Sequence, residues 1–206
     1  MHNMKHNLEL SIQGHVKIYD PESQQVFVDQ HNAIHFENIS EAMANSLAGG
    51  VRTGIREMHF GRGGTSINST GVINYLPPNT NTQNSGLYNY VFHKSVDEND
   101  AEQNRDRGRN RMQVRHIPGT VYSDILVTCL LDYGEPQGQY AFDNASTVDS
   151  QFVFDELGLR AYGTDRGNGK LLTHVIFHPV QKSLNRLIQI DYTIRIQSLT
   201  NLTGLY

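Results

Sequence analysis

Near its C-terminus the chain reads Arg186-Leu-Ile-Gln-Ile-Asp-Tyr-Thr-Ile-Arg-Ile-Gln197. Apolar and polar side chains alternate along this segment, which is typical of a β-strand with one buried face. The polar residues are expected to face outward or to meet a neighbouring molecule. The residues expected to face a core are Ile188, Ile190, Tyr192, Ile194 and Ile196.

Two further β-type segments precede this strand, Gln151–Leu159 and Leu171–Phe177, and the Gly-rich turn 163–169 joins them. At the other end of the chain, residues 8–29 alternate in the same way around the turn residues Asp20–Ser23, which predicts a β-hairpin. Both ends of the chain are therefore expected to contribute strands to a sheet.

One helix is predicted, from about Asn38 to Ala48. Asn38 or Ser40 is expected to cap it, and Gly49-Gly50 is expected to end it. Its apolar stripe is narrow, which suits a helix laid on a sheet. A further strand is expected at Ile55–Phe60. The residues of the stripe are Ile39, Met43, Ala44 and Leu47.

The region 76–113 is expected to be largely extended and exposed, because residues 77–86 offer little to a core and residues 97–111 are charged. Four arginines stand at alternate positions, so in an extended chain they would project from one side. Acidic neighbours offset their charge and no aromatic residues interleave to stack on bases, which favours a subunit contact or solvated loop over nucleic acid. The four are Arg105, Arg107, Arg109 and Arg111.

These elements predict a single β-rich structural domain over residues 1–206. The expected fold is mainly β, an antiparallel β-sandwich or partly open barrel with one short helix and long extended loops.

The chain has 206 residues and a formal net charge of −4 with neutral histidine, so it shows no overall basic footprint for nucleic acid or an anionic membrane. No apolar run is long enough to span a bilayer, and Met1–Asn7 lacks the layout of a signal peptide. The lone Cys129 lies in an apolar alternating run, which predicts a buried, inert thiol. We therefore expect a reducing, aqueous compartment.

Histidine pairs and a glycine-rich segment are the candidate metal and anion sites. His31 and His35, like His174 and His178, have the spacing of zinc ligands on a helix. Because the predicted context is loop and strand, we expect hydrogen-bonded structural histidines and no metal or cofactor. Gly61-Arg-Gly-Gly-Thr65 lacks the lysine of a phosphate-binding loop, so a turn is favoured.

No catalytic constellation is evident, and we expect no enzymatic activity. Asp155 and Glu156 are neighbouring carboxylates, but adjacent residues of a strand point to opposite faces and cannot jointly flank one bond. The simpler interpretation is that this pair ends a strand and that Gly158 turns the chain. Cys129 lies within a strand, and no Gly-x-Ser-x-Gly motif occurs.

Several segments resemble virion structural proteins of contractile-tailed bacteriophages, including those that infect cyanobacteria. The similarity covers nearly the whole chain and implies assembly, with no catalytic residues. The N-terminal segments are Gly14–Asp20, Val28–His35, Ile55–Thr65 and Thr70–Pro78, and the C-terminal block is Phe152–Leu159, Leu171–Lys182 and Gln189–Arg195.

The resemblance implies a virion subunit that assembles in the host cytoplasm, in contact with copies of itself and with other virion proteins. We expect an oligomeric ring or collar at the neck or tail, with Arg195 and the four alternating arginines as a possible subunit interface. The alternatives are a baseplate or fibre-attachment protein, or a carbohydrate-binding β-sandwich that uses Tyr88, Tyr90 and Tyr162 as platforms. Neither nucleic acid nor a membrane is expected as a partner.

Overall fold

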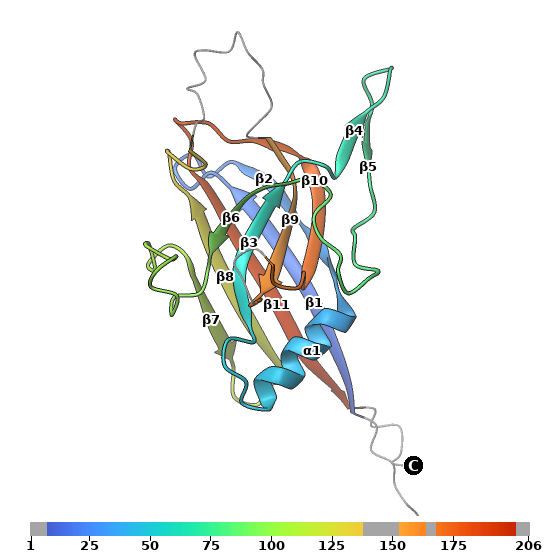
Figure 1. The fold of residues 1–206 in the computed structure, drawn as a ribbon, viewed down its shortest axis with the longest axis vertical. Coiled ribbons are helices and arrows are strands. Elements are labelled where there is room, and N and C mark those ends of the chain that lie inside the picture. Colours follow the sequence, from blue (N-terminus) through green and yellow to red (C-terminus); the bar gives the residue numbers. More distant parts are fainter. Residues whose placement is uncertain (1–7, 138–152, 164–167, 201–206) are drawn as a thin grey trace, which may run out of the picture.

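The computed structural model describes residues 8–137, 153–163 and 168–200. The N-terminal segment 1–7, considered above as a signal peptide, and residues 164–167 of the Gly-rich turn lie outside the described residues. The described chain is mainly β, with half of it in strands and a single helix (Figure 1). The elements are β1 (Leu8–Tyr19), β2 (Val26–Ile34), α1 (Phe36–Leu47), β3 (Ile55–Gly61), β4 (Thr65–Ile67), β5 (Ile73–Tyr75), β6 (Tyr90–Ser95), β7 (Arg111–His116), β8 (Tyr122–Leu131), β9 (Val153–Ala161), β10 (Thr173–Gln181) and β11 (Ile188–Thr200).

Nine of the strands form one antiparallel sheet in the order β6-β3-β9-β10-β2-β1-β11-β8-β7, and β4 and β5 form a second, small sheet. The large sheet curls into a half-barrel, which confirms the partly open barrel of the predicted fold class. In Figure 1, α1 lies across one end of the half-barrel and the β4–β5 hairpin extends beyond the main sheet.

β11 lies at the centre of one half of the sheet, between β1 and β8. The side chains predicted to face the core are buried from Ile188 to Ile194, and Ile196 packs against the edge of the core. Cys129 is the cross-strand neighbour of Ile190 and is also buried. The inward assignment of this strand and the burial of the thiol are confirmed.

The predicted hairpin at residues 8–29 is also confirmed, with longer strands. β1 runs unbroken to Tyr19, and β2 continues to Ile34. In the turn between them, the Asp20 carboxylate accepts the backbone N–H of Glu22 at 2.8 Å and of Ser23 at 3.2 Å. This side chain stabilises the turn by satisfying backbone donors that have no ladder partner.

The helix begins earlier than expected, and the predicted cap is wrong. His35 is the N-cap, and its Nδ1 accepts the backbone N–H of Asn38 at 3.3 Å. Asn38 lies within the helix, where its side-chain amide donates to the carbonyl of Leu171 at 2.9 Å. Asn38 therefore ties α1 to the chain before β10 rather than capping it.

The predicted end of the strand at Asp155 and Glu156 is also wrong. β9 does not end at Asp155 and Glu156 but continues to Ala161, through Gly158. A Cβ at Gly158 would come within 2.6 Å of the Thr173 carbonyl oxygen, so close packing against the next chain segment explains the glycine.

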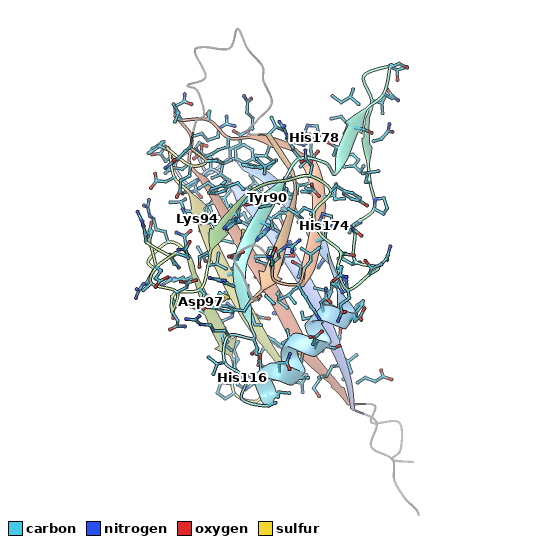
Figure 2. The ribbon with its side chains drawn as sticks, viewed as in Figure 1. Tyr90, Lys94, Asp97, His116, His174 and His178 are labelled. Atoms are coloured by element: carbon cyan, nitrogen blue, oxygen red, sulfur yellow. The ribbon has the colours of Figure 1, made fainter. Side chains whose placement is uncertain are left out.

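The region 76–113, predicted to be largely extended and exposed, contains β6 and the start of β7 and buries several side chains, among them Val96 and Asp97. Figure 2 labels Lys94 on β6. Its ammonium group donates to the Leu130 carbonyl of β8 at 2.7 Å, across the open side of the half-barrel. Leu130 in turn donates its backbone N–H to the side chain of Asn110 at 2.9 Å. Asn104 and Asn110 are buried, so the loop between β6 and β7 orders itself through polar contacts.

Candidate functional site

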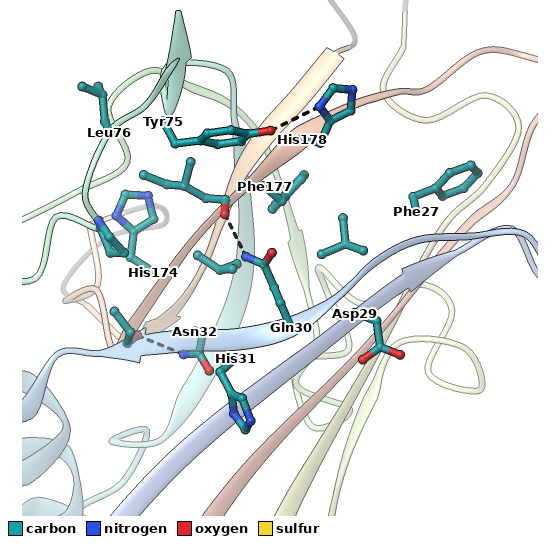
Figure 3. A pocket seen from close by; sticks show the side chains of 15 residues that line it. Phe27, Asp29, Gln30, His31, Asn32, Tyr75, Leu76, His174, Phe177 and His178 are labelled. Carbon is teal, nitrogen blue, oxygen red and sulfur yellow. Dashed lines mark hydrogen bonds between the residues drawn. The ribbon is translucent and has the colours of Figure 1, made fainter. Parts of the chain in front are cut away.

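The large sheet has a break between β2 and β10. These strands pair only at Ile34 with Thr173 and at Ala33 with His174, and beyond these pairs they separate. The side-chain amide of Gln30 spans the gap and donates to the carbonyl of Ile176 at 2.8 Å (Figure 3). One side-chain hydrogen bond therefore replaces the backbone ladder at this point.

The break opens into a groove with a volume of about 450 Å³. β2 and β10 form its two sides, and Tyr75 of β5 and the following Leu76 also line it. A hydrogen bond of 3.3 Å joins the Tyr75 hydroxyl to Nδ1 of His178 on β10 (Figure 3). The groove presents aromatic and imidazole side chains beside the edges of β2 and β10 that do not pair with each other across the break, a combination that suits an extended peptide.

The β4–β5 hairpin, which we call the arm, is a second distinctive feature. Thr65 pairs with Tyr75 and Ile67 with Ile73, so these four side chains share one face, whereas Ser66 and Asn74 occupy the other. At the tip, the Asn68 side chain accepts the backbone N–H groups of the turn, which fixes its shape.

Asp155 holds the root of the arm. Its buried carboxylate accepts the backbone N–H groups of Gly64 and Thr65 at 3.0 Å and the Thr65 hydroxyl at 2.5 Å. A carboxylate that accepts several hydrogen bonds in a buried position fixes the direction of the segment that donates them. The arm therefore leaves the body in a defined direction.

The arm carries no charged side chain, and one of its faces exposes apolar side chains. Ile67 is 71% exposed and Tyr75 is 52% exposed, while on the same face the Thr65 hydroxyl contacts Asp155 and the Tyr75 hydroxyl contacts His178 of β10. The sequence has no Asp, Glu, Lys or Arg from Gly63 to Phe92, although such residues make up 18% of the chain. Charge depletion together with exposed apolar side chains is characteristic of the centre of protein interfaces.

Glu156 and His174 anchor the segment that follows the arm. His174 donates from Nε2 to the Glu156 carboxylate at 3.0 Å, and its Nδ1 accepts the backbone N–H of Asn79 at 2.8 Å. The same carboxylate accepts the backbone N–H groups of Tyr88 and Asn89, each at 2.8 Å. Asp155 and Glu156 thus bind different segments, which agrees with the expectation that they cannot act jointly on one bond.

A second buried pair lies on β3, where His59 donates to Glu57 at 2.9 Å. Burial lowers the pKa of His59, so its ring is neutral near pH 7. Burial alone would raise the pKa of Glu57, but the hydrogen bond from His59 and the nearby His93 outweigh it and lower that pKa. His93 stacks on His59, with the ring centroids 5.2 Å apart.

The histidines considered as metal ligands all make hydrogen bonds within the chain. No group of three or more side chains suited to a metal ion occurs in the described residues. The partners are the Gly14 carbonyl for His31, the Thr82 carbonyl for His35, Glu156 for His174 and Tyr75 for His178.

The extended geometry predicted for residues 105–111 is wrong. The chain turns after Asp106, whose carbonyl accepts the backbone N–H groups of Arg109 at 3.3 Å and of Asn110 at 2.9 Å. Arg109 also forms ion pairs with Asp106 and Asp132. Arg105, Arg107, Arg109 and Arg111 therefore do not lie along one side of a strand, and their role in a subunit interface stays a prediction.

Arg195 is engaged within the chain. Its guanidinium makes two hydrogen bonds, of 2.7 and 3.0 Å, with the buried carboxylate of Asp124, which Arg115 also contacts at 2.9 Å. The hydrogen bond from Arg195 is the main cause that lowers the pKa of Asp124 to about 2. Arg195 also lies over the Tyr122 ring, 4.1 Å from its centroid.

The tyrosines considered as carbohydrate platforms contact their own chain. The Tyr88 hydroxyl donates to the Pro77 carbonyl at 2.7 Å, and the Tyr90 ring stacks with His93. Tyr162 donates to Asp97 and packs against the guanidinium of Arg56. Their polar groups are therefore engaged, although Tyr88 and Tyr90 remain partly exposed.

Sequence reasoning missed the groove, the arm and the Glu156–His174 anchor. A signal for the arm was present, because Thr65–Ile67 and Ile73–Tyr75 alternate around the turn residues Asn68–Gly71. No comparable signal marks the groove, which depends on which strands become neighbours.

In the described part of the chain, no helix has the length and hydropathy needed to cross a membrane. Comparison with known proteins gave no relatives: no family model, no curated protein and no solved structure matches the chain.

Proposed function

We propose that this chain is a structural subunit of a tailed-bacteriophage virion, where it forms an oligomeric ring or collar at the neck or tail. The observation that supports this role best is the projecting arm, with its exposed apolar face and its lack of charge. The resemblance of several segments to virion proteins of contractile-tailed phages supplies the biological setting.

The arm favours an assembly role because a two-stranded hairpin is marginally stable in water on its own. The chain nevertheless anchors this hairpin through Asp155 and directs it away from the body (Figure 1). A partner that covers Ile67 and Ile73 would remove apolar surface from water, at about 25 cal/mol per Å². Neighbouring copies of the chain and other virion proteins are the proposed partners.

Light scattering and electron microscopy test the proposal. The purified chain should form particles of one defined mass, with ring-shaped images in negative stain. Antibody labelling of intact phage particles should then mark the neck or tail. Labelling at the baseplate or fibre roots would favour the alternative position, and absence of the chain from purified virions would contradict the proposal.

A further inference from the structure

β7 is an open edge strand of the large sheet. It is the last strand in the sheet order, and among the described residues no strand pairs with its outer side. The other terminal strand, β6, is held toward β8 by Lys94, whereas Val114 of β7 is 75% exposed. An exposed edge strand presents unpaired N–H and C=O groups that can pair with another chain.

The arm also has backbone N–H and C=O groups without a strand partner, as the edge of β7 does, because β4 and β5 pair only with each other in the described chain. Each of these strands therefore has one free edge. The strands are short enough to lie within the length of β7.

The faces of the arm and of β7 match. On β7, Met112 packs against the core and Val114 shares its face, whereas Gln113 faces the other way. On the arm, Ile67 lies on the apolar face of its strand and Ser66 lies on the polar face. An arm strand added to β7 with the apolar faces aligned would place apolar side chains beside Val114, the arrangement that stabilises neighbouring strands.

The arm and β7 lie on opposite sides of the molecule (Figure 1). The arm of a chain is therefore remote from its own β7, and the two surfaces can meet only between copies. Identical subunits joined through two different surfaces associate head to tail, and they form a ring when the rotation closes.

We propose that the β4–β5 arm of one copy adds to the outer edge of β7 in the next copy. This inference rests on one part of the proposed function, namely that copies of the chain associate with one another. The second copy is the single occupant of the β7 edge, and main-chain hydrogen bonds together with the aligned apolar faces provide the contact.

One substitution tests each of the two surfaces, and a second substitution on the same strand serves as its matched control. Ile67→Lys and Val114→Lys place a charge in the contact, and each should weaken self-association by more than about tenfold, which is about 1.4 kcal/mol. Ser66→Lys and Gln113→Lys place the same charge on the opposite faces of the same strands and should change the association constant by less than about twofold. Sedimentation velocity across a concentration series measures the association. Should a lysine variant melt below the wild-type chain, Ile67→Ser or Val114→Ser takes its place.

A mixture of Ile67→Lys and Val114→Lys provides the decisive measurement. The first variant keeps an intact β7 and the second keeps an intact arm, so together they can form one contact and no more. The mixture should contain a one-to-one dimer, whereas each variant alone should be a monomer. A mixture that stays monomeric, a Val114→Lys chain that still dimerises alone, or a monomeric wild-type chain would each overturn the inference.

Detection in virions separates this inference from the proposed function. If the mixture fails to dimerise and the chain is nevertheless found in particles, the arm-to-β7 contact is wrong and the virion role stands. If the dimer forms and purified virions lack the chain, the contact stands and the virion role is wrong.

Discussion

Gln30 and Ile176 are joined across the break in the sheet by a hydrogen bond from a side-chain amide to a backbone carbonyl. The two residues lie 146 positions apart in the chain, on strands that have no ladder between them at this level. At this level of the break a side chain therefore links β2 and β10 beside the groove.

Replacing Gln30 by alanine should loosen this junction. The Ile176 carbonyl would lose its partner, which we expect to cost about 0.5–1.5 kcal/mol. Hydrogen exchange should become faster in β2 and β10 while the protection of β11 stays the same. Gln13→Ala, at an exposed position of β1, is the control, and equal exchange in both variants would show that Gln30 does not hold the junction.

Ile190→Ala should destabilise the fold by about 2–5 kcal/mol, because Ile190 is fully buried and its truncation leaves a cavity. Urea unfolding measures the loss. Gln189→Ala, on the opposite face of the same strand, should cost less than about 1 kcal/mol. The inward assignment of this strand fails if the two variants reverse their order.

Glu156→Gln should weaken the anchor of the segment after the arm. The carboxylate accepts three hydrogen bonds, and the amide would turn a donor toward donors, at a cost of about 1–3 kcal/mol. Hydrogen exchange of residues 77–89 should accelerate before the core opens. Glu9→Gln, at an exposed carboxylate of β1, should leave exchange in this segment unchanged, and a slow rate in both variants would contradict the anchoring role.

Asp124 should make stability dependent on pH in acid. Its folded pKa of about 2 lies below its ordinary value of 3.8, mainly because Arg195 donates to it. The ionised group therefore contributes stability that is present above about pH 4 and lost as the pH falls toward about 2. In urea unfolding, the stability difference between the wild-type chain and Asp124→Asn should narrow in this window. Asp29→Asn, at an exposed carboxylate, is the control. A stability difference between the wild-type chain and Asp124→Asn that stays constant as the pH falls would contradict the prediction.

Arg195→Glu should destabilise the isolated chain, because it would place a negative charge beside the buried carboxylate of Asp124. The alternation of the strand alone suggests a surface position where charge reversal is nearly neutral. Thermal melting distinguishes the two expectations, with Arg107→Glu as the control at an exposed loop position. An unchanged melting temperature for both variants would show that the ion pair with Asp124 does not stabilise the fold.

Cys129 should resist thiol reagents in the folded chain, because burial raises its pKa to about 12. Near pH 8 almost none of the reactive thiolate is then present. Labelling with a disulfide reagent should be slow in buffer and complete in urea. Rapid labelling of the folded chain would place Cys129 outside the core.

The strands at both ends of the chain could be predicted because alternation is a local property of the sequence. Ile188 to Ile194 alternate with polar residues whichever strand lies beside them. The N-cap was missed because His35 fills a position where Asn, Asp, Ser or Thr is usual. The alternating arginines misled for a different reason, since hydrogen bonding at Asp106 bends the chain between them.

The groove and the buried anchors could not be predicted from local pattern. Glu156 and His174 meet only because β9 and β10 become neighbours, and the groove exists only because β2 and β10 do. Such contacts depend on strand order, which the sequence pattern does not specify. The arm lay within reach of prediction, but its three-residue strands give a weak period-two signal.

The break between β2 and β10 also determines how the molecule would respond to mechanical load. When force pulls across a sheet, neighbouring strands share it through their ladders, and the long ladders of β11 with β1 and β8 distribute it over many bonds. At the break, the load would fall on the pairs Ile34–Thr173 and Ala33–His174 and on the Gln30 bridge. Under tension the half-barrel would therefore separate first between β2 and β10, and a neighbour bound in the groove would hold these two strands together.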